Sequence, residues 1–164
     1  MSAARIILLM GVTGAGKTTI GRRLAAELGW PYFEADDFHS AANRDKMGRG
    51  IALDDADRAP WLAAIRARMD DCLTAEQSAV FTCSALKEKY RDVLLTGAPG
   101  VKLVFLTADI ATIQARVYQR KQHFMKAGMV KSQFDALEVP RSALTLDARQ
   151  TPEAIVTAIR KSLV

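Results

Sequence analysis

The stretch RIILLMGVTGAGKT, residues 5–18, determines the fold of this chain. Its first half is a short apolar run ending at Met10, which is typical of a strand buried within a parallel sheet. Its second half, Gly11–Thr18, matches the pattern G-x-x-x-x-G-K-[ST]. A loop of this kind directs its backbone N–H groups toward phosphate oxygens. The stretch therefore predicts a strand followed by a phosphate-binding loop.

Two side chains of this loop have expected chemical roles. Lys17 is expected to reach the β- and γ-phosphates of a nucleotide, and the Thr18 hydroxyl to ligate Mg²⁺. The helix that begins at the loop adds the positive end of its dipole. We therefore predict that the phosphates of ATP contact nine consecutive residues. These are Gly11, Val12, Thr13, Gly14, Ala15, Gly16, Lys17, Thr18 and Thr19.

The residues after the loop favour a functional nucleotide site. Ile20, Leu24 and Leu28 recur at helical spacing, and Gly29 is a helix stop signal. Strand, glycine-rich loop and helix in this order form the expected setting of a phosphate loop. The alternative is an ordinary glycine-rich turn between a strand and a helix. That alternative leaves the lysine and threonine of the motif unexplained.

The composition indicates one globular domain over residues 1–164. Hydrophobic residues make up 49% and charged residues 25%, which suits a chain with a sizeable buried core. No apolar run approaches the roughly 20 residues that a membrane span needs, so no membrane partner is expected. The apolar N-terminus leads straight into the phosphate loop and is interpreted as core, not as a secretion signal. The two cysteines, Cys72 and Cys83, are too few for a disulfide framework, which favours a reducing cytoplasm.

The formal net charge of +5 raises the question of a nucleic-acid partner. The basic residues are scattered, with no polybasic tail and no basic stripe interleaved with aromatic residues. A small anionic substrate together with ATP accounts for the surplus, so no nucleic-acid partner is expected. An RNA-binding role would instead require strongly salt-dependent association.

Apolar and amphipathic segments alternate along the chain. Strands are expected near 5–10, 31–35, 79–83, 101–107 and 143–147. Helices are expected over 17–28, 57–74, 85–95, 109–120 and 151–162. This alternation predicts an α/β fold in which helices cover both faces of a five-stranded parallel sheet. Residues 121–140 lack strand signals, so we expect a helical excursion outside these layers.

Acidic residues follow the second predicted strand. Because α/β sheets bind ligands at the carboxyl ends of their strands, Asp36 is expected to accept or orient the proton of an acceptor hydroxyl. Glu34 is expected to face the magnesium ion through water. The alternative is that these acids only cap the following helix. His39 is either a substrate contact or a hydrogen-bonded structural residue.

Basic side chains in two further segments suit an anion. Arg58 either pairs with surface acids or binds a substrate carboxylate, in a segment where Asp57 is expected to cap a helix and Pro60 to lie in its first turn. Arg116 and Arg120 lie four residues apart on a predicted helix, where like charges repel unless they share an anion. Either arginine would neutralise charge on a transferring phosphoryl group. The alternative is a solvated basic face.

Other classes of phosphate-loop protein fit this sequence less well. A GTPase would carry an N-K-x-D motif, which is absent from the chain. A motor-type ATPase would place an aspartate directly after a long apolar strand, whereas the 79–83 strand ends in Cys83-Ser84. A compact kinase for a small molecule fits best, because it needs only a phosphate loop, a carboxylate, cations and a cover that excludes water.

With these residues identified, the chain closely resembles the gluconokinase family of small P-loop kinases over nearly its whole length. The matching segments are Gly11–Thr18, Asp36–His39 with Asn43, Gly50–Asp55, Asp57–Leu62, Cys83–Lys87, Tyr90–Asp92, His123–Met125, Ser132–Phe134, Leu137-Glu138 and Pro140. The segments C-S-A-L-K-x-x-Y-R and H-F-M…S-Q-F-x-x-L-E-x-P are far more restrictive than the phosphate loop. The chain departs from the family pattern at Ala35, Ser40, Ala41-Ala42 and Ala52.

The resemblance implies a three-layer P-loop fold with a helical lid around 121–140. It also implies ATP-dependent phosphorylation of D-gluconate at its 6-hydroxyl, with Mg²⁺, by a homodimer. Lys17, Asp36 and Arg120 are then expected to be catalytic, with Arg120 closing onto the phosphates. Substrate contacts are expected from Asp36, His39, Arg58, Lys87, Arg91 and His123, and the carboxylate is assigned to Arg58, Lys87 or Arg91. Two alternatives stay open: a kinase of another hydroxy acid, such as shikimate, and a non-catalytic nucleotide-binding regulator.

Overall fold

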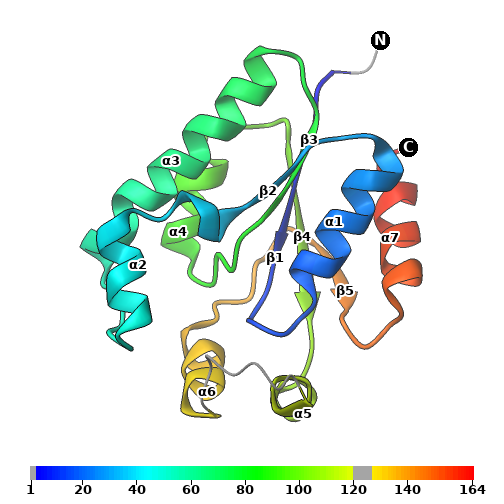
Figure 1. Ribbon diagram of the computed structural model, residues 1–164. Coiled ribbons are helices and arrows are strands. Elements are labelled where there is room, and N and C mark those ends of the chain that lie inside the picture. The colour runs from blue at the N-terminus through cyan, green and yellow to red at the C-terminus, as the bar shows by residue number, and fades with distance from the viewer. Residues whose placement is uncertain (1–2, 120–126) are drawn as a thin grey trace.

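A computed structural model describes residues 3–119 and 127–164 of the chain. Its centre is a five-stranded parallel sheet with strand order β2-β3-β1-β4-β5 (Figure 1). The strands are β1 Ile6–Met10, β2 Tyr32–Glu34, β3 Ala79–Thr82, β4 Val101–Thr107 and β5 Leu144–Asp147. All five occur where the sequence predicts them, and the predicted α/β fold of the P-loop type is confirmed.

Helices cover both faces of this sheet. Figure 1 shows α1 and α7 on one face and α3 and α4 on the other. The helices are α1 Lys17–Leu28, α2 Ala41–Gly48, α3 Asp55–Thr74, α4 Glu88–Leu95, α5 Ile110–Gln119, α6 Ala127–Ala136 and α7 Pro152–Lys161, and η1 Ala35–Phe38 is a 3₁₀ helix. Within the described ranges, none of these helices combines the length and the apolarity that a membrane crossing requires.

Strand β1 is completely buried, as is its neighbour β3, and each of its residues is 0% exposed. Ile7 and Leu9 pack into the core formed with α1 and α7, whereas Ile6, Leu8 and Met10 pack into the core formed with α3 and α4. A strand buried on both faces has no polar side, which explains its unbroken apolar run. The phosphate loop therefore leaves the sheet from a strand that is buried on both faces.

Helix α3 begins two residues earlier than predicted. Asp54, not Asp57, is its N-cap: the Asp54 carboxylate accepts the Asp57 backbone N–H at 2.7 Å, and the Asp57 carboxylate accepts the Asp54 N–H at 3.1 Å. This reciprocal pair is a capping box, so Asp57 occupies the third helical position. Pro60 accordingly lies in the second turn of the helix and not in its first.

The short helix α2 has no counterpart among the predicted helices. Asn43 is its only buried residue, so the segment carries none of the apolar periodicity that signals a helix. A local signal is present at its start, where the Ser40 hydroxyl accepts the Asn43 backbone N–H at 3.1 Å. Helix α2 lies beside the start of α3, beyond the end of β2 (Figure 1).

Two other segments refine the predicted elements. Helix α4 starts at Glu88, three residues later than expected, because Ala85 adopts a left-handed φ of 46° that is incompatible with a helix. Residues 85–87 therefore form a loop after β3. Helix α6 lies beside α5 and away from the two helical layers, which confirms the expected helical excursion for its described part (Figure 1).

Candidate active site

The loop Gly11–Gly16 joins β1 to α1 in a tight turn. Gly14 and Gly16 have φ values of 88° and 97°, a conformation that residues with a side chain rarely adopt. The Lys17 Nζ turns back over the loop and donates to the carbonyls of Gly11 at 2.8 Å and Val12 at 3.1 Å. Among the residues that the structure describes, no side chain caps the N-terminus of α1 at Gly16. Its first amides and the helix dipole are therefore suited to an anion.

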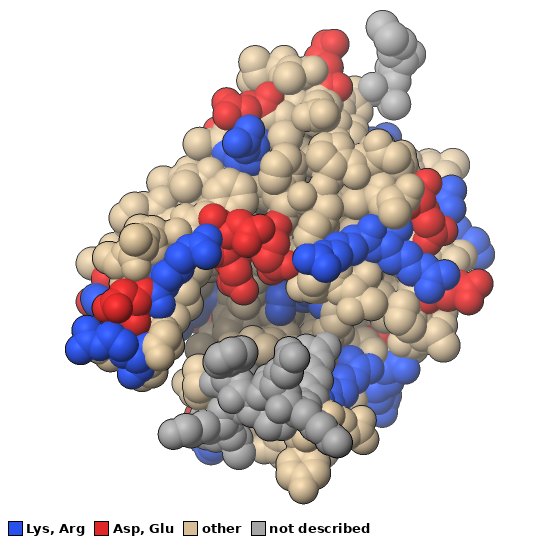
Figure 2. Space-filling model, in the orientation of Figure 1, with Lys and Arg blue, Asp and Glu red and all other residues tan. Residues whose placement is uncertain are grey.

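A cavity of about 870 Å³ opens beside this loop. Its lining includes the following residues predicted from the sequence: Thr13, Gly14, Gly16, Lys17, Thr18, Thr19, Glu34, Asp36, His39, Arg58 and Lys87. Figure 2 shows this face of the molecule hollowed next to a cluster of acidic side chains. The other three predicted phosphate contacts, Gly11, Val12 and Ala15, do not line the cavity. All three are buried residues of the loop itself.

Thr18 and Glu34, the residues suited to magnesium, line the cavity. They belong to a chain of hydrogen bonds that continues to Tyr32 and Thr82. Glu34 Oε2 accepts from the Thr18 hydroxyl at 2.9 Å and from the Tyr32 hydroxyl at 2.5 Å. The Tyr32 oxygen lies 2.7 Å from the Thr82 hydroxyl, and burial together with the hydrogen bond to Glu34 raises the pKa of Tyr32 to about 12. No cluster of three or more His, Cys, Asp or Glu in the described ranges could hold a metal by itself. A hydroxyl and one carboxylate fit Mg²⁺, which keeps several waters and shares substrate phosphates.

Asp36 lies in η1, directly beyond β2, and its carboxylate opens into the cavity. The residue is solvent-exposed overall, but nearby protein atoms partly desolvate its carboxyl group, which raises its pKa, and the negative charge of Glu34 raises the pKa further. The charge of His39 when that ring is protonated, and the charge of Lys17, act in the opposite direction. A carboxylate with a raised pKa is a better proton acceptor than an ordinary one, which suits a general base.

His39 lines the same cavity but is only 8% exposed. Its ring stacks on Trp61 with the ring centres 4.3 Å apart and the planes 12° apart. Burial lowers its pKa, so the neutral imidazole is the form that the site favours. The ring is therefore held by structural contacts, as one of the two alternatives predicted. It also lines the cavity, and its contact with a substrate stays a prediction.

Arg58 and Lys87 bring two positive charges to the lining of the cavity. Both approach the ring of Tyr90, with the Arg58 guanidinium carbon 5.4 Å and the Lys87 Nζ 6.0 Å from its centre. Arg58 also lies 3.6 Å from the Asp55 carboxylate, but this pair is largely solvent-exposed and therefore weak. Both cations thus remain suited to a substrate carboxylate.

Arg91, the third predicted carboxylate ligand, does not line the cavity. It is 5% exposed, and its guanidinium donates to the carbonyls of Ala85 at 2.8 Å, Leu86 at 3.0 Å and Glu138 at 2.7 Å. The structure therefore places Arg91 beneath the loop that carries Lys87 and gives it a supporting contact in place of the predicted substrate contact.

The predicted pair of arginines on α5 is only partly described. Arg116 donates to the carbonyls of Gly14 and Ala15, each at 3.4 Å, and of Ala148 at 2.5 Å. Arg116 therefore supports the phosphate loop by binding two of its carbonyl groups. Arg120 and His123 lie outside the described residues.

Several cavity residues carried no predicted role. They include Met47 and the segment 50–53 on one side, and Met129, Ser132, Gln133 and Ala136 of α6 on the other. Gln133 contacts the phosphate loop directly: its Oε1 accepts the Thr13 backbone N–H at 2.7 Å. No local pattern reveals this contact, because the two residues are 120 positions apart. The restrictive S-Q-F segment was the only available signal.

A phosphate loop at the carboxyl edge of a parallel sheet, facing an acidic residue across a cavity, defines the class of P-loop kinases for small molecules. Comparison with known proteins narrows this class. A family profile described as an AAA domain matches residues 6–149. The thermosensitive gluconokinase of Escherichia coli K12 is 43% identical over 140 residues, which span 85% of this chain and 75% of that protein.

Solved structures agree with the sequence comparison. A gluconokinase from Sinorhizobium meliloti 1021 superposes with a TM-score of 0.84 at 35% identity, covering 99% of this chain and 97% of that one. An unliganded sugar kinase from Janibacter sp. HTCC2649 superposes with a TM-score of 0.90 at 42% identity, covering 98% and 94%. The chain belongs to the gluconokinase family.

Proposed function

We propose that this chain, as a single domain over residues 1–164, is an ATP-dependent gluconokinase that converts D-gluconate to 6-phospho-D-gluconate. The observation that carries this proposal is that Lys17 of the phosphate loop and Asp36 beyond β2 line one cavity. Curated relatives at 34% to 43% identity are gluconokinases, which gives the shikimate-kinase alternative weaker support.

The reaction follows from the placement of these groups. The phosphates of ATP bind at Thr13–Thr19, where the loop amides and Lys17 stabilise the negative charge that spreads over the transferring group. The gluconate 6-hydroxyl oxygen attacks the γ-phosphorus, and the bond from that phosphorus to the β–γ bridging oxygen breaks. The hydroxyl proton passes to Asp36, whose raised pKa suits it to accept a proton. ADP and 6-phosphogluconate are the products.

Magnesium, when bound, neutralises charge on the phosphates, and Thr18 with Glu34 would hold it. The hydroxyl of Thr18 supplies a direct ligand, and Glu34 suits a water of the ion's hydration shell. Arg120 and His123 stay assigned to the phosphates and to the substrate, respectively, on the strength of the family resemblance alone.

The sugar-acid carboxylate is best assigned to Arg58 and Lys87. They line the same cavity as Asp36, so a carboxylate bound between them would leave the hydroxyls of the same molecule to extend toward Asp36. A carboxylate between two cations would also relieve their mutual repulsion. This assignment replaces Arg91, whose guanidinium is occupied by three backbone carbonyls.

The family resemblance further supports a homodimer, to be checked by sedimentation. A cytoplasmic location fits the cysteines, because Cys72 and Cys83 are both free and buried. Burial raises the pKa of Cys83 to about 12, so its thiol is unreactive at neutral pH.

The test is ADP release measured with gluconate, its epimers, 2-keto-gluconate, glucose and shikimate. We expect gluconate to give the highest kcat/KM. Lys17→Ala should abolish turnover without changing the circular dichroism spectrum, because the loop would lose its phosphate contact and keep its core. Preference for shikimate would contradict the proposed substrate. ATP binding without ADP release from any acceptor would instead identify a nucleotide-binding regulator.

A further inference from the structure

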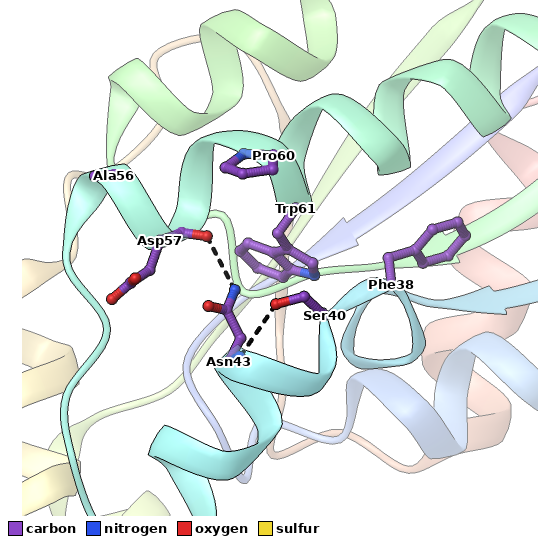
Figure 3. A pocket seen from close by; sticks show the side chains of 7 residues that line it. All are labelled: Phe38, Ser40, Asn43, Ala56, Asp57, Pro60 and Trp61. Atoms are coloured by element: carbon purple, nitrogen blue, oxygen red, sulfur yellow. Dashed lines mark hydrogen bonds between the residues drawn. The ribbon is translucent and has the colours of Figure 1, made fainter.

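The amide of Asn43 has only one orientation that fits its neighbours. Its nitrogen Nδ2 lies 2.9 Å from the carbonyl oxygen of Asp57, at the start of α3 (Figure 3). A carbonyl oxygen only accepts hydrogen bonds, so the atom facing it must be the NH₂ group and not the amide oxygen. The opposite orientation would set two acceptor oxygens against each other. The Asn43 backbone is fixed as well, since its N–H donates to the hydroxyl of Ser40, the N-cap of α2.

This orientation determines which nitrogen of His39 carries hydrogen. The same Asn43 Nδ2 lies 3.3 Å from His39 Nδ1, and both groups are buried. An amide NH₂ has hydrogens to donate and no lone pair to offer, so Nδ1 must present its own lone pair. In a neutral imidazole the hydrogen then lies on Nε2. A doubly protonated ring would turn an N–H toward the NH₂ group of Asn43, which opposes its charging.

The His39 ring has little freedom to turn away from this arrangement. Trp61 stacks on it and is fixed by a hydrogen bond from its Nε1 to the Ala35 carbonyl at 2.7 Å. Arg44 donates to the His39 carbonyl at 3.3 Å. Charges from three elements face the ring: Asp36 of η1 favours the imidazolium form, whereas Arg44 of α2 and Arg58 of α3 oppose it.

Because Nδ1 is directed at Asn43, which lines a different pocket, the opposite edge of the ring, with Nε2, is the one left to face the main cavity. His39 lines that cavity together with Asp36 and Arg58. Asn43 instead lines a separate pocket of about 330 Å³ beyond Trp61 (Figure 3). Within the ranges that the structure describes, no protein group forms a hydrogen bond with Nε2. The Nε2 hydrogen is therefore available to a ligand.

We propose that Asn43 is a positioning residue that holds His39 as the neutral Nε2–H tautomer, so that His39 donates a hydrogen bond to an oxygen of the polyhydroxy-acid substrate. The inference rests on the proposed function. Two neighbouring residues then have different roles. Asp36 accepts the proton of the reacting hydroxyl, whereas His39 donates a hydrogen bond to another oxygen of the same substrate molecule. His39 is accordingly a substrate-binding donor and not a proton acceptor.

The tautomer can be observed directly by long-range ¹H–¹⁵N NMR of the free protein. The chain has two histidines, and His123→Gln assigns the signals of His39. At neutral pH we expect an unprotonated Nδ1 and a protonated Nε2, and added gluconate should shift the Nε2 signal more than the Nδ1 signal. A protonated Nδ1, or an Nε2 unaffected by saturating gluconate, would overturn the proposal. The tautomer is read without substrate, so it can fail separately from the proposed reaction.

Variants test whether Asn43 acts through His39. Asn43→Ala should raise the KM for gluconate about fivefold, the effect of one weakened hydrogen bond, with the KM for ATP changed less than about twofold. Ser40→Ala is the matched control, because it removes the helix cap at Asn43 and leaves the amide contacts in place. In a His39→Ala background, Asn43→Ala should have little further effect on KM. Full additivity of the two changes would refute a positioning role.

If Asn43→Ala does not fold, Asn43→Asp provides the second test. Its carboxylate can accept a hydrogen from Nδ1, so the ring should change to the Nδ1–H or charged form and its pKa should rise. An unchanged tautomer and an unchanged pKa in this variant would contradict control by residue 43.

Discussion

Gln133 and Thr13 form a two-point contact between helix α6 and the phosphate loop. The Gln133 Oε1 accepts the Thr13 backbone N–H at 2.7 Å, and its Nε2 donates to the Thr13 hydroxyl at 2.9 Å. On α5, Arg116 reaches the neighbouring carbonyls of Gly14 and Ala15. The tip of the loop is thus held from two helices that lie outside the main layers. Its geometry depends on residues far from it in sequence.

Gln133→Ala is expected to weaken ATP binding more than gluconate binding. The substitution removes both contacts to Thr13, so the loop tip loses a support that orders it before the phosphates arrive. Two neutral hydrogen bonds at about 1 kcal/mol each predict a rise in the KM for ATP of up to about thirtyfold. Steady-state kinetics with each substrate varied in turn would measure this difference.

Two further variants on α6 make this prediction specific. Gln133→Glu keeps an acceptor for the Thr13 N–H and places a negative charge on the cavity wall beside the phosphates, so the KM for ATP should rise further than in Gln133→Ala. Lys131→Ala is the control, because it removes only the exposed ion pair with Asp135 on the same helix. Equal effects of all three changes would indicate a general disturbance of α6.

The pKa of Asp36 predicts the acid side of the pH–rate profile. Partial desolvation of the carboxyl group and the charge of Glu34 raise this pKa, and the base must be ionised to accept a proton. The rate should therefore increase with pH through an apparent pKa above the ordinary aspartate value near 4. Asp36→Asn should lower kcat about 10²- to 10⁴-fold and leave ATP affinity nearly unchanged. A loss confined to ATP affinity would make Asp36 a metal-side residue.

The same residue should oppose stability at neutral pH. Its folded-state pKa lies above the unfolded value, so between the two values the folded state binds more protons. Stability from this group is present below the unfolded pKa and is lost as pH rises through the folded pKa. Asp36→Asn should therefore raise Tm at pH 7 and change it little near pH 3. A fall in Tm at pH 7 would contradict this linkage.

The sequence predicted most of the fold because its signals are local. The strand ending at Met10 and the loop after it are written in consecutive residues, and burial on both faces explains the apolar run. The short helix α2 was missed because only Asn43 among its residues is buried, which leaves no periodic pattern. The start of α3 was displaced because Asp54 and Asp57 are both acceptable caps and only their reciprocal contact decides between them.

The site was predicted less completely because it depends on long-range contacts. Lys17 was predicted from the phosphate-loop motif, and Asp36 from its position after a strand. The parallel sheet brings these two residues to one edge. Arg91 was predicted to bind the substrate carboxylate because a basic residue in a family motif suggests an anion. Its guanidinium instead donates to backbone carbonyls, and one of these belongs to the distant residue Glu138. Gln133 was not assigned a role because its partner Thr13 lies near the opposite end of the chain.

The contacts of Arg91 predict a loss of stability together with a change in substrate affinity. Arg91→Ala would leave the buried carbonyl of Ala85 without its donor and the Leu86 carbonyl with only the Glu138 N–H, which should cost about 1–3 kcal/mol in the free energy of unfolding. Because these carbonyls belong to the loop that carries Lys87, the KM for gluconate should rise as well. Urea unfolding and kinetics on one preparation measure both effects. A higher KM with unchanged stability would restore Arg91 as a direct ligand.

The close approach of α1 to the sheet at Gly21 gives the last prediction. A Cβ at Gly21 would lie 2.6 Å from Cε1 of Tyr32 and 2.7 Å from Cγ2 of Thr82, both below van der Waals contact. Gly21→Ala should therefore destabilise the fold by about 1–3 kcal/mol. A displaced Tyr32 would also release its hydrogen bond to Glu34, so the Mg²⁺ concentration that gives half-maximal activity should increase.

Gly48→Ala is the matched control for this substitution. Gly48 is also helical, but a Cβ there meets no atom within 4 Å, so alanine should stabilise the protein by about 0.5–1 kcal/mol through helix propensity. The midpoint of urea unfolding compares the two variants at constant m. If Gly21→Ala were as stable as Gly48→Ala and kept the wild-type Mg²⁺ dependence, the packing of α1 against Tyr32 would not control the position of Glu34.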